Sequence, residues 1–117
     1  IKAYCRRTNQ PVPETIGQLA TVIYQSLAES YAETFDDVEA LTGKKYKAVN
    51  IVGGGSNAAY LNELTARKSG RTVYAGPSEA TAIGNLTVQM IEAGLLGSLG
   101  EARKCIFDSF GVKEYSA

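Results

Sequence analysis

The 117-residue sequence contains no histidine, and only two of its residues are cysteines. Without histidine the chain cannot build a Ser-His-Asp or Cys-His catalytic unit, and it lacks the usual nitrogen ligand of zinc. The two cysteines, Cys5 and Cys105, lie near opposite ends of the chain with no CxxC pattern, which excludes a zinc cluster and a thioredoxin-like motif. We therefore expect two reduced thiols and neither of the common hydrolase chemistries.

The sequence also lacks net charge, because 12 Lys and Arg residues balance 12 Asp and Glu residues. This balance argues against a basic nucleic-acid-binding domain and against an acidic tail. No apolar run reaches the roughly 18 residues of a membrane span, so we expect neither a membrane span nor a signal peptide and predict a cytoplasmic protein. The first residues, Ile1-Lys2-Ala3, include no Met and suggest the interior of a longer protein.

The longest regular pattern predicts a helix from Ile16 to just before Gly43. Thr15 followed by Gln18 is a capping-box signal, and Gly43 suits the left-handed position after a helix. Between them, apolar residues recur every three or four positions. They are Ile16, Leu19, Ile23, Leu27, Tyr31, Phe35, Val38 and Leu41. We expect this stripe to pack on a sheet, with a cofactor groove or a coiled-coil seam as alternatives.

Two short strands are predicted at residues 47–52 and 72–75, separated by a helix that Ser56 or Asn57 caps and Gly70 ends. Strands joined by a crossover helix should be parallel. A two-stranded parallel sheet is a poor core by itself, because parallel sheets are normally covered on both faces. The sheet therefore needs additional partners.

Two further helices follow the second strand. The first should open at Gly76-Pro77-Ser78, with Pro77 in its first turn and Ser78 as a cap, and end at Gly94. Its small residues Ala80, Ala82 and Gly84 predict close backbone packing. The second should begin at Ser98, with Glu101 completing a capping box, and end near Phe110.

The most informative segment is the glycine turn Gly53-Gly54-Gly55-Ser56-Asn57 after the first strand. Glycines there let the backbone approach a ligand, and free N–H groups at the start of a helix favour an anion or a polar nucleotide group. A tight turn without a ligand is the alternative. A Walker motif is excluded because no lysine follows before Lys68. A dinucleotide fingerprint through Ala58 and Glu79 fits weakly, because Glu79 falls after a Gly-Pro turn rather than at a strand end.

Three segments, residues 49–57, 66–70 and 75–85, together resemble the C-terminal domain of FGGY carbohydrate kinases, and the likeness extends over nearly the whole chain. Within that family, the similarity is greatest to members that act on L-rhamnulose. The resemblance implies a helix-rich α/β fold: a partial actin-like, ribonuclease-H-like ATPase lobe with two short parallel strands and four to five helices. Residues 1–117 would be the C-terminal nucleotide-binding segment of a longer chain.

The same resemblance implies transfer of the ATP γ-phosphate, with Mg²⁺, to the 1-hydroxyl of L-rhamnulose. Gly53, Gly54 and Gly55 match the family's adenosine motif, with Gly54 as the main backbone contact. Ser56 and Asn57 match its edge on the adenine and ribose side. Glu79 matches a turn beside the nucleotide, or it caps a helix. The catalytic aspartate, the phosphate-binding loop and the sugar contacts would belong to a preceding N-terminal kinase lobe, so the segment alone would be inactive.

Two other functions stay open at this point. The chain could belong to a family member that acts on fuculose, xylulose or glycerol. It could also be a self-associating helical module, a homodimer whose glycine turn binds nothing. Asp36-Asp37 are expected on a solvated helix face rather than in a catalytic or metal pair. Lys44, Lys45 and Lys47 are expected in a hydrated turn.

Overall fold

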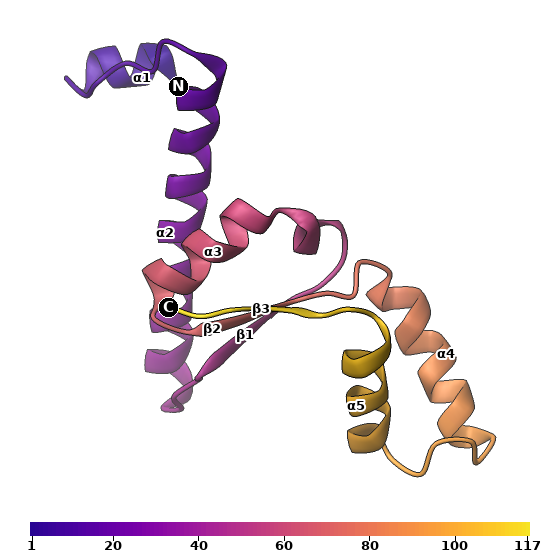
Figure 1. Ribbon diagram of the computed structural model, residues 1–117. Helices are drawn as coiled ribbons and strands as arrows, with labels where there is room; N and C mark the ends of the chain where they lie inside the picture. Colours follow the sequence, from indigo (N-terminus) through magenta and orange to yellow (C-terminus); the bar gives the residue numbers. More distant parts are fainter.

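The computed structural model describes all residues from 1 to 117 and shows a three-stranded sheet flanked by helices (Figure 1). This helix-rich α/β architecture confirms the predicted fold class. The helices are α1 (Lys2–Arg7), α2 (Ile16–Thr42), α3 (Ala59–Ser69), α4 (Ala80–Glu92) and α5 (Leu99–Ser109), with a 3-10 turn η1 (Gly54–Asn57). The strands are β1 (Ala48–Ile51), β2 (Thr72–Ala75) and β3 (Lys113–Tyr115).

The sheet has the order β1-β2-β3 and mixes two pairing directions. β1 and β2 are parallel, with Ala48 opposite Thr72, and α3 connects them as predicted. β3 is antiparallel to β2, with Lys113 opposite Ala75. The two predicted parallel strands are confirmed, and β3 is a third strand that the sequence did not predict, because its three residues form a strand by pairing with β2 rather than from a pattern of their own.

The ends of α2 follow the sequence signals. The Thr15 hydroxyl oxygen accepts a hydrogen bond from the Gln18 N–H at 3.1 Å, and the Gln18 side-chain oxygen accepts one from the Thr15 N–H at 3.1 Å. Gly43 has φ 66°, the left-handed conformation expected after a helix. The predicted bounds of α2 are therefore confirmed.

The apolar stripe of α2, which we call the α2 stripe, is packed only in part. Phe35 contacts the core cluster of Val49, Ala66 and Val73. The two ends of the stripe, Ile16 and Leu41, are 88% and 86% exposed, and several residues between them are also exposed. Those residues are Ile23, Leu27, Tyr31 and Val38. The expectation that the whole stripe packs on the sheet was wrong for this chain.

The two faces of the sheet contact different helices. Val73 of β2 is buried beside Ala66 of α3, whereas the next residue, Tyr74, makes an edge contact with Phe107 of α5, with ring centroids 5.8 Å apart. Alternate residues of a strand point to opposite faces. Consequently α2 and α3 lie on one side of the sheet and α5 lies on the other, with α4 beside it (Figure 1).

The starts of α3 and α4 differ from the predictions. Ser56 and Asn57 do not cap α3; they form η1, and α3 begins at Ala59 without a side-chain cap. Pro77 and Ser78 precede α4, whose N-cap is Glu79.

In α4, Ala82 and Gly84 are exposed and no heavy atom lies within 4 Å of a Cβ placed on Gly84, so the expected close packing is not formed here. At α5, the Ser98 hydroxyl accepts from the Glu101 N–H at 3.2 Å, as predicted. The Glu101 carboxylate accepts from the Gly97 N–H at 2.8 Å rather than from the Ser98 N–H, so the predicted capping box forms only in part.

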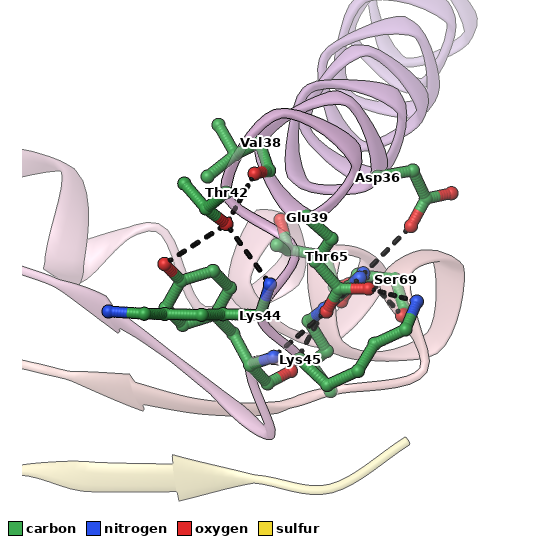
Figure 2. Close-up of polar contacts among 10 residues, drawn as sticks. Asp36, Val38, Glu39, Thr42, Lys44, Lys45, Thr65 and Ser69 are labelled. Atoms are coloured by element: carbon green, nitrogen blue, oxygen red, sulfur yellow. Dashed lines mark hydrogen bonds and ion pairs between the residues drawn. The ribbon is translucent and has the colours of Figure 1, made fainter.

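A partly buried ion cluster joins the end of α2 to the start of β2 (Figure 2). The Arg71 side chain donates to Asp36 at 2.9 Å and to the Tyr46 carbonyl at 3.2 Å, and it lies 3.0 Å from a Glu39 oxygen. Asp36 is thus an ion-pair partner rather than only a solvated residue. Lys45, whose side chain is 88% exposed, donates to Glu39 at 2.6 Å. The cluster fixes the turn that leads into β1 against β2.

Hydrogen bonds to Glu39 lower its pKa to about 2 from an ordinary 4.5. The largest cause is the Lys45 ammonium, followed by the Tyr46 N–H and the Arg71 guanidinium, all of which stabilise the ionised carboxylate. The Arg71 pKa is raised by its bonds to Asp36 and Glu39. Both groups therefore stay charged at neutral pH, so the cluster contributes to holding the fold together.

Candidate functional site

The glycine turn lies at the carboxyl end of β1, directly beside the loop that follows β2. Gly53 has φ 76° and ψ −165°, a region open essentially only to glycine. Its N–H donates to the Pro77 carbonyl at 3.0 Å, and the Gly76 N–H donates to the Ile51 carbonyl at 2.8 Å. In open α/β sheets, ligands bind in the crevice at the carboxyl ends of the strands, which is where this turn is held.

Side chains behind the turn hold its carbonyl groups. Ser56 is buried, and both its N–H and its hydroxyl donate to the Gly53 carbonyl, at 3.0 and 2.7 Å. The Ser56 carbonyl in turn accepts from the side-chain nitrogen of Asn62 on α3 at 2.9 Å. Asn62 was missed by sequence reasoning, because nothing in the helical pattern marks its side chain as turning back toward η1.

The solvent-exposed side of the turn consists of the backbone of two glycines. Gly54 and Gly55 are exposed, and no heavy atom lies within 4 Å of a Cβ placed on Gly54. The first N–H groups of a helical turn lack intrahelical acceptors, and those of Gly54 and Gly55 form no turn or loop hydrogen bond. The geometry therefore leaves two backbone donors open to a polar or anionic group.

A small cavity of about 90 Å³ adjoins the turn. Ser56 and Asn57 line one side, and Gly76, Pro77 and Ser78 line another. Phe110, Gly111 and Lys113 also line it, from the segment that ends α5 and begins β3. Sequence reasoning missed these last three because they reach the turn only through β3, which lacks a local signal.

Glu79 is placed apart from the other predicted residues. It is exposed at the N-cap of α4, its side chain makes no capping hydrogen bond, and it does not line the small cavity. The structure thus brings Gly53, Gly54, Gly55, Ser56 and Asn57 together in one turn. The loop of residues 76–78, which precedes Glu79, lines the small cavity beside this turn, but Glu79 itself does not. The alternative role of the Glu79 side chain, capping α4, is not observed.

Larger cavities, of about 390, 470, 580 and 750 Å³, are also present, and those of 390 and 580 Å³ reach the residues around the turn. A cleft of about 390 Å³ with mainly apolar walls lies between α2, β1 and α3 and reaches Gly55 and Asn62. A groove of about 750 Å³ lies along the start of α2 and contains Glu14 as its only ionisable side chain.

The chain has no cluster of three or more His, Cys, Asp or Glu residues that could hold a metal ion. None of its helices is long and apolar enough to span a bilayer. Cys5 and Cys105 are both free thiols.

Together, the parallel β1–η1–α3–β2 unit and its open glycine turn define a helix-rich α/β lobe with a ligand-accessible strand edge. The chain belongs to the FGGY family of carbohydrate kinases, whose C-terminal domain matches residues 2–93. The resemblance inferred from the sequence is therefore confirmed.

Rhamnulokinases are among the most similar curated proteins. The chain is 44% identical to the one from Halalkalibacterium halodurans over 98% of its length, 47% identical to that of Ligilactobacillus salivarius over 99%, and 46% identical to that of Bacillus subtilis over 99%. These alignments cover 25%, 24% and 24% of the respective relatives. The chain thus spans about a quarter of the length of the curated relatives it matches.

Proposed function

We propose that this chain is the C-terminal nucleotide-binding segment, residues 1–117, of a cytoplasmic sugar kinase that transfers the γ-phosphate of ATP to the 1-hydroxyl of L-rhamnulose. The choice of sugar is supported by the identity to rhamnulokinases over almost the whole chain. The observation that carries the nucleotide role is the exposed turn at Gly54, where the N–H groups of Gly54 and Gly55 form no turn or loop hydrogen bond and the space around a Cβ on Gly54 is open.

In this proposal the turn supplies orientation rather than bond-making. Gly54 would contact the adenosine part of ATP through its backbone, while Ser56 and Asn57 would form the edge of the site and Glu79 would lie beside it. Phosphoryl transfer depends on positioning and on electrostatic stabilisation of the transferred group. A rigid backbone surface without a Cβ can supply the first of these, since a nucleotide can approach it closely.

The electrostatic part of the reaction is assigned to the rest of the kinase. From the resemblance to the family, we assign the Mg²⁺ that accompanies ATP mainly to the preceding N-terminal lobe of the longer kinase. The catalytic aspartate, the phosphate-binding loop and the sugar contacts are assigned to the same lobe. The isolated chain would then be inactive, and the lobe would be its principal partner.

The sugar assignment is tested by assaying the full-length kinase for ATP-dependent phosphorylation of L-rhamnulose, L-fuculose, D-xylulose and glycerol. We expect the highest kcat/KM with L-rhamnulose. Equal or better activity with another of these acceptors would overturn the assignment to rhamnulose while leaving the family unchanged.

The nucleotide role is tested separately with Gly54→Val in the same protein. A branched side chain at Gly54 would occupy the open space in front of the turn, so we expect a higher KM for ATP and an unchanged KM for the sugar. Unchanged ATP kinetics would remove Gly54 from the nucleotide site.

A further inference from the structure

Asn62 is a fully buried polar residue, 0% exposed, in the first turns of α3 immediately behind the glycine turn. We propose that Asn62 is a positioning residue for the nucleotide: its side-chain N–H group fixes the Ser56 carbonyl and thereby the glycine turn. The inference rests on the proposed function, because it assigns to Asn62 the shaping of the surface that would receive ATP.

The contacts form a continuous path from α3 to the turn. The Asn62 amide nitrogen donates to the Ser56 carbonyl at 2.9 Å. The Ser56 hydroxyl donates to the Gly53 carbonyl at 2.7 Å, and the Gly53 N–H donates to the Pro77 carbonyl at 3.0 Å. Each of these hydrogen bonds restricts the rotation of a peptide group in the turn. Together they hold η1 between α3 and the loop after β2. Gly54 and Gly55 are the residues of this turn whose N–H groups remain free.

The side-chain oxygen of Asn62 indicates that this residue contributes through its N–H donor. The Asn62 side-chain oxygen is buried and has no hydrogen-bond partner. A buried acceptor without a partner is unfavourable, and an apolar side chain of similar volume would avoid that loss. Reversing the amide does not help, because its oxygen would then face the Ser56 carbonyl oxygen. An asparagine is therefore a poor residue for packing alone at this place, but it supplies the donor that the turn requires.

Such a donor affects binding by preorganisation. Without it, the Ser56 carbonyl would lose its partner in the chain, and the peptide groups of η1 could rotate. A nucleotide would then have to order the turn on binding, which weakens its affinity without altering the chemical step. The expected signature is a change confined to the KM for ATP.

The test uses the full-length kinase with Asn62→Leu, which has a similar volume but no donor. We expect the KM for ATP to rise about three- to tenfold, as the loss of one hydrogen bond predicts, with kcat and the KM for the sugar changed by less than about twofold. The matched control is Thr65→Val, also fully buried and one turn further along α3, whose hydroxyl donates only to the Leu61 carbonyl within the helix. We expect this variant to keep the wild-type KM for ATP.

Asn62→Asp provides a second variant of the same size. Its carboxyl group can donate to the Ser56 carbonyl only while protonated. We therefore expect its KM for ATP, relative to the wild type, to rise with increasing pH as the carboxyl ionises.

The outcomes separate this inference from the function on which it rests. If Gly54→Val raises the KM for ATP but Asn62→Leu and Asn62→Asp at pH 8.5 stay within twofold of the wild type, the positioning role is wrong and the nucleotide site stands. If Asn62→Leu raises the KM for both substrates and lowers the melting temperature, the residue is structural and the inference is also wrong. If Gly54→Val leaves ATP kinetics unchanged, the proposed site itself fails.

Discussion

Adjacent glycines in the turn have different physical roles. Gly53 has a backbone conformation that other residues rarely adopt, and its N–H is tied to Pro77. Gly54 needs no such conformation and is exposed with free space around it. The sequence predicted the turn but could not distinguish the two roles, because the conformation of Gly53 depends on a loop more than twenty positions away. The first glycine therefore maintains the fold, and the second is free to serve a ligand.

This division predicts that Gly53→Ala destabilises the protein and that Gly54→Ala does not. A Cβ at Gly53 would make only an ordinary contact with the Ser78 carbonyl oxygen at 4.0 Å, so the loss would come from backbone strain of about 1–3 kcal/mol. Gly54→Ala should change the unfolding free energy by less than about 0.5 kcal/mol, as for an ordinary surface substitution. Urea unfolding of the two variants checks this pair, and equal losses would contradict it.

At the level of elements, what could be predicted depended on how local the stabilising contacts are. The bounds of α2 were correct because the capping box and Gly43 act within a few residues of each helix end. β3 was missed because its three residues become a strand only against β2. The Arg71–Asp36 hydrogen bond was missed for a similar reason, since its residues are 35 positions apart. Lys113 escaped notice because only the pairing of β3 with β2 brings it to the turn. Asn62 is six positions from Ser56, but the helical pattern does not mark its side chain as turning back toward η1.

The cluster around Glu39 predicts a pH dependence of stability. The folded-state pKa of Glu39 is about 2, below its ordinary value of 4.5, so the ionised carboxylate stabilises the fold fully above pH 4.5. This stabilisation is lost as the pH falls from 4.5 through 2, because the unfolded state then binds the proton more readily than the folded state. Glu39→Gln should therefore lower the unfolding midpoint at pH 7, with a difference from the wild type that shrinks between pH 4.5 and 2.

The matched control for this experiment is Glu29→Gln on the same helix. Glu29 also pairs with a lysine, Lys68, at 2.8 Å, but both side chains are substantially exposed. Exposed pairs of this kind contribute little, so the variant should behave like the wild type at every pH. Urea midpoints measured for both variants across this range provide the comparison. A difference for Glu39→Gln that stays constant with pH would show that its charge is not the cause.

The whole molecule is far from compact. Its radius of gyration is 18.0 Å, whereas a compact domain of this length would have about 13 Å. Only 15 of 117 residues are buried, and the principal extents are 61 × 34 × 21 Å. A length of 117 residues would suit one ordinary domain, but the exposed α2 stripe leaves apolar area uncovered. In the longer kinase that we propose, the rest of the chain would cover it.

This exposed area predicts that the isolated chain associates with itself. Apolar stripes of this extent are unfavourable in water, and two copies could bury them against each other. Light scattering after size exclusion should give a mass above 12.5 kDa that increases with concentration.

Leu27→Glu, in the middle of the α2 stripe, should shift the chain toward the monomer, because a buried interface cannot accept two unpaired carboxylates. Leu95→Glu, at a 70% exposed residue after α4 and off the stripe, is the control and should leave the mass unchanged. A monomer at all concentrations would show that the α2 stripe does not mediate self-association, and equal effects of the two variants would place the contact elsewhere.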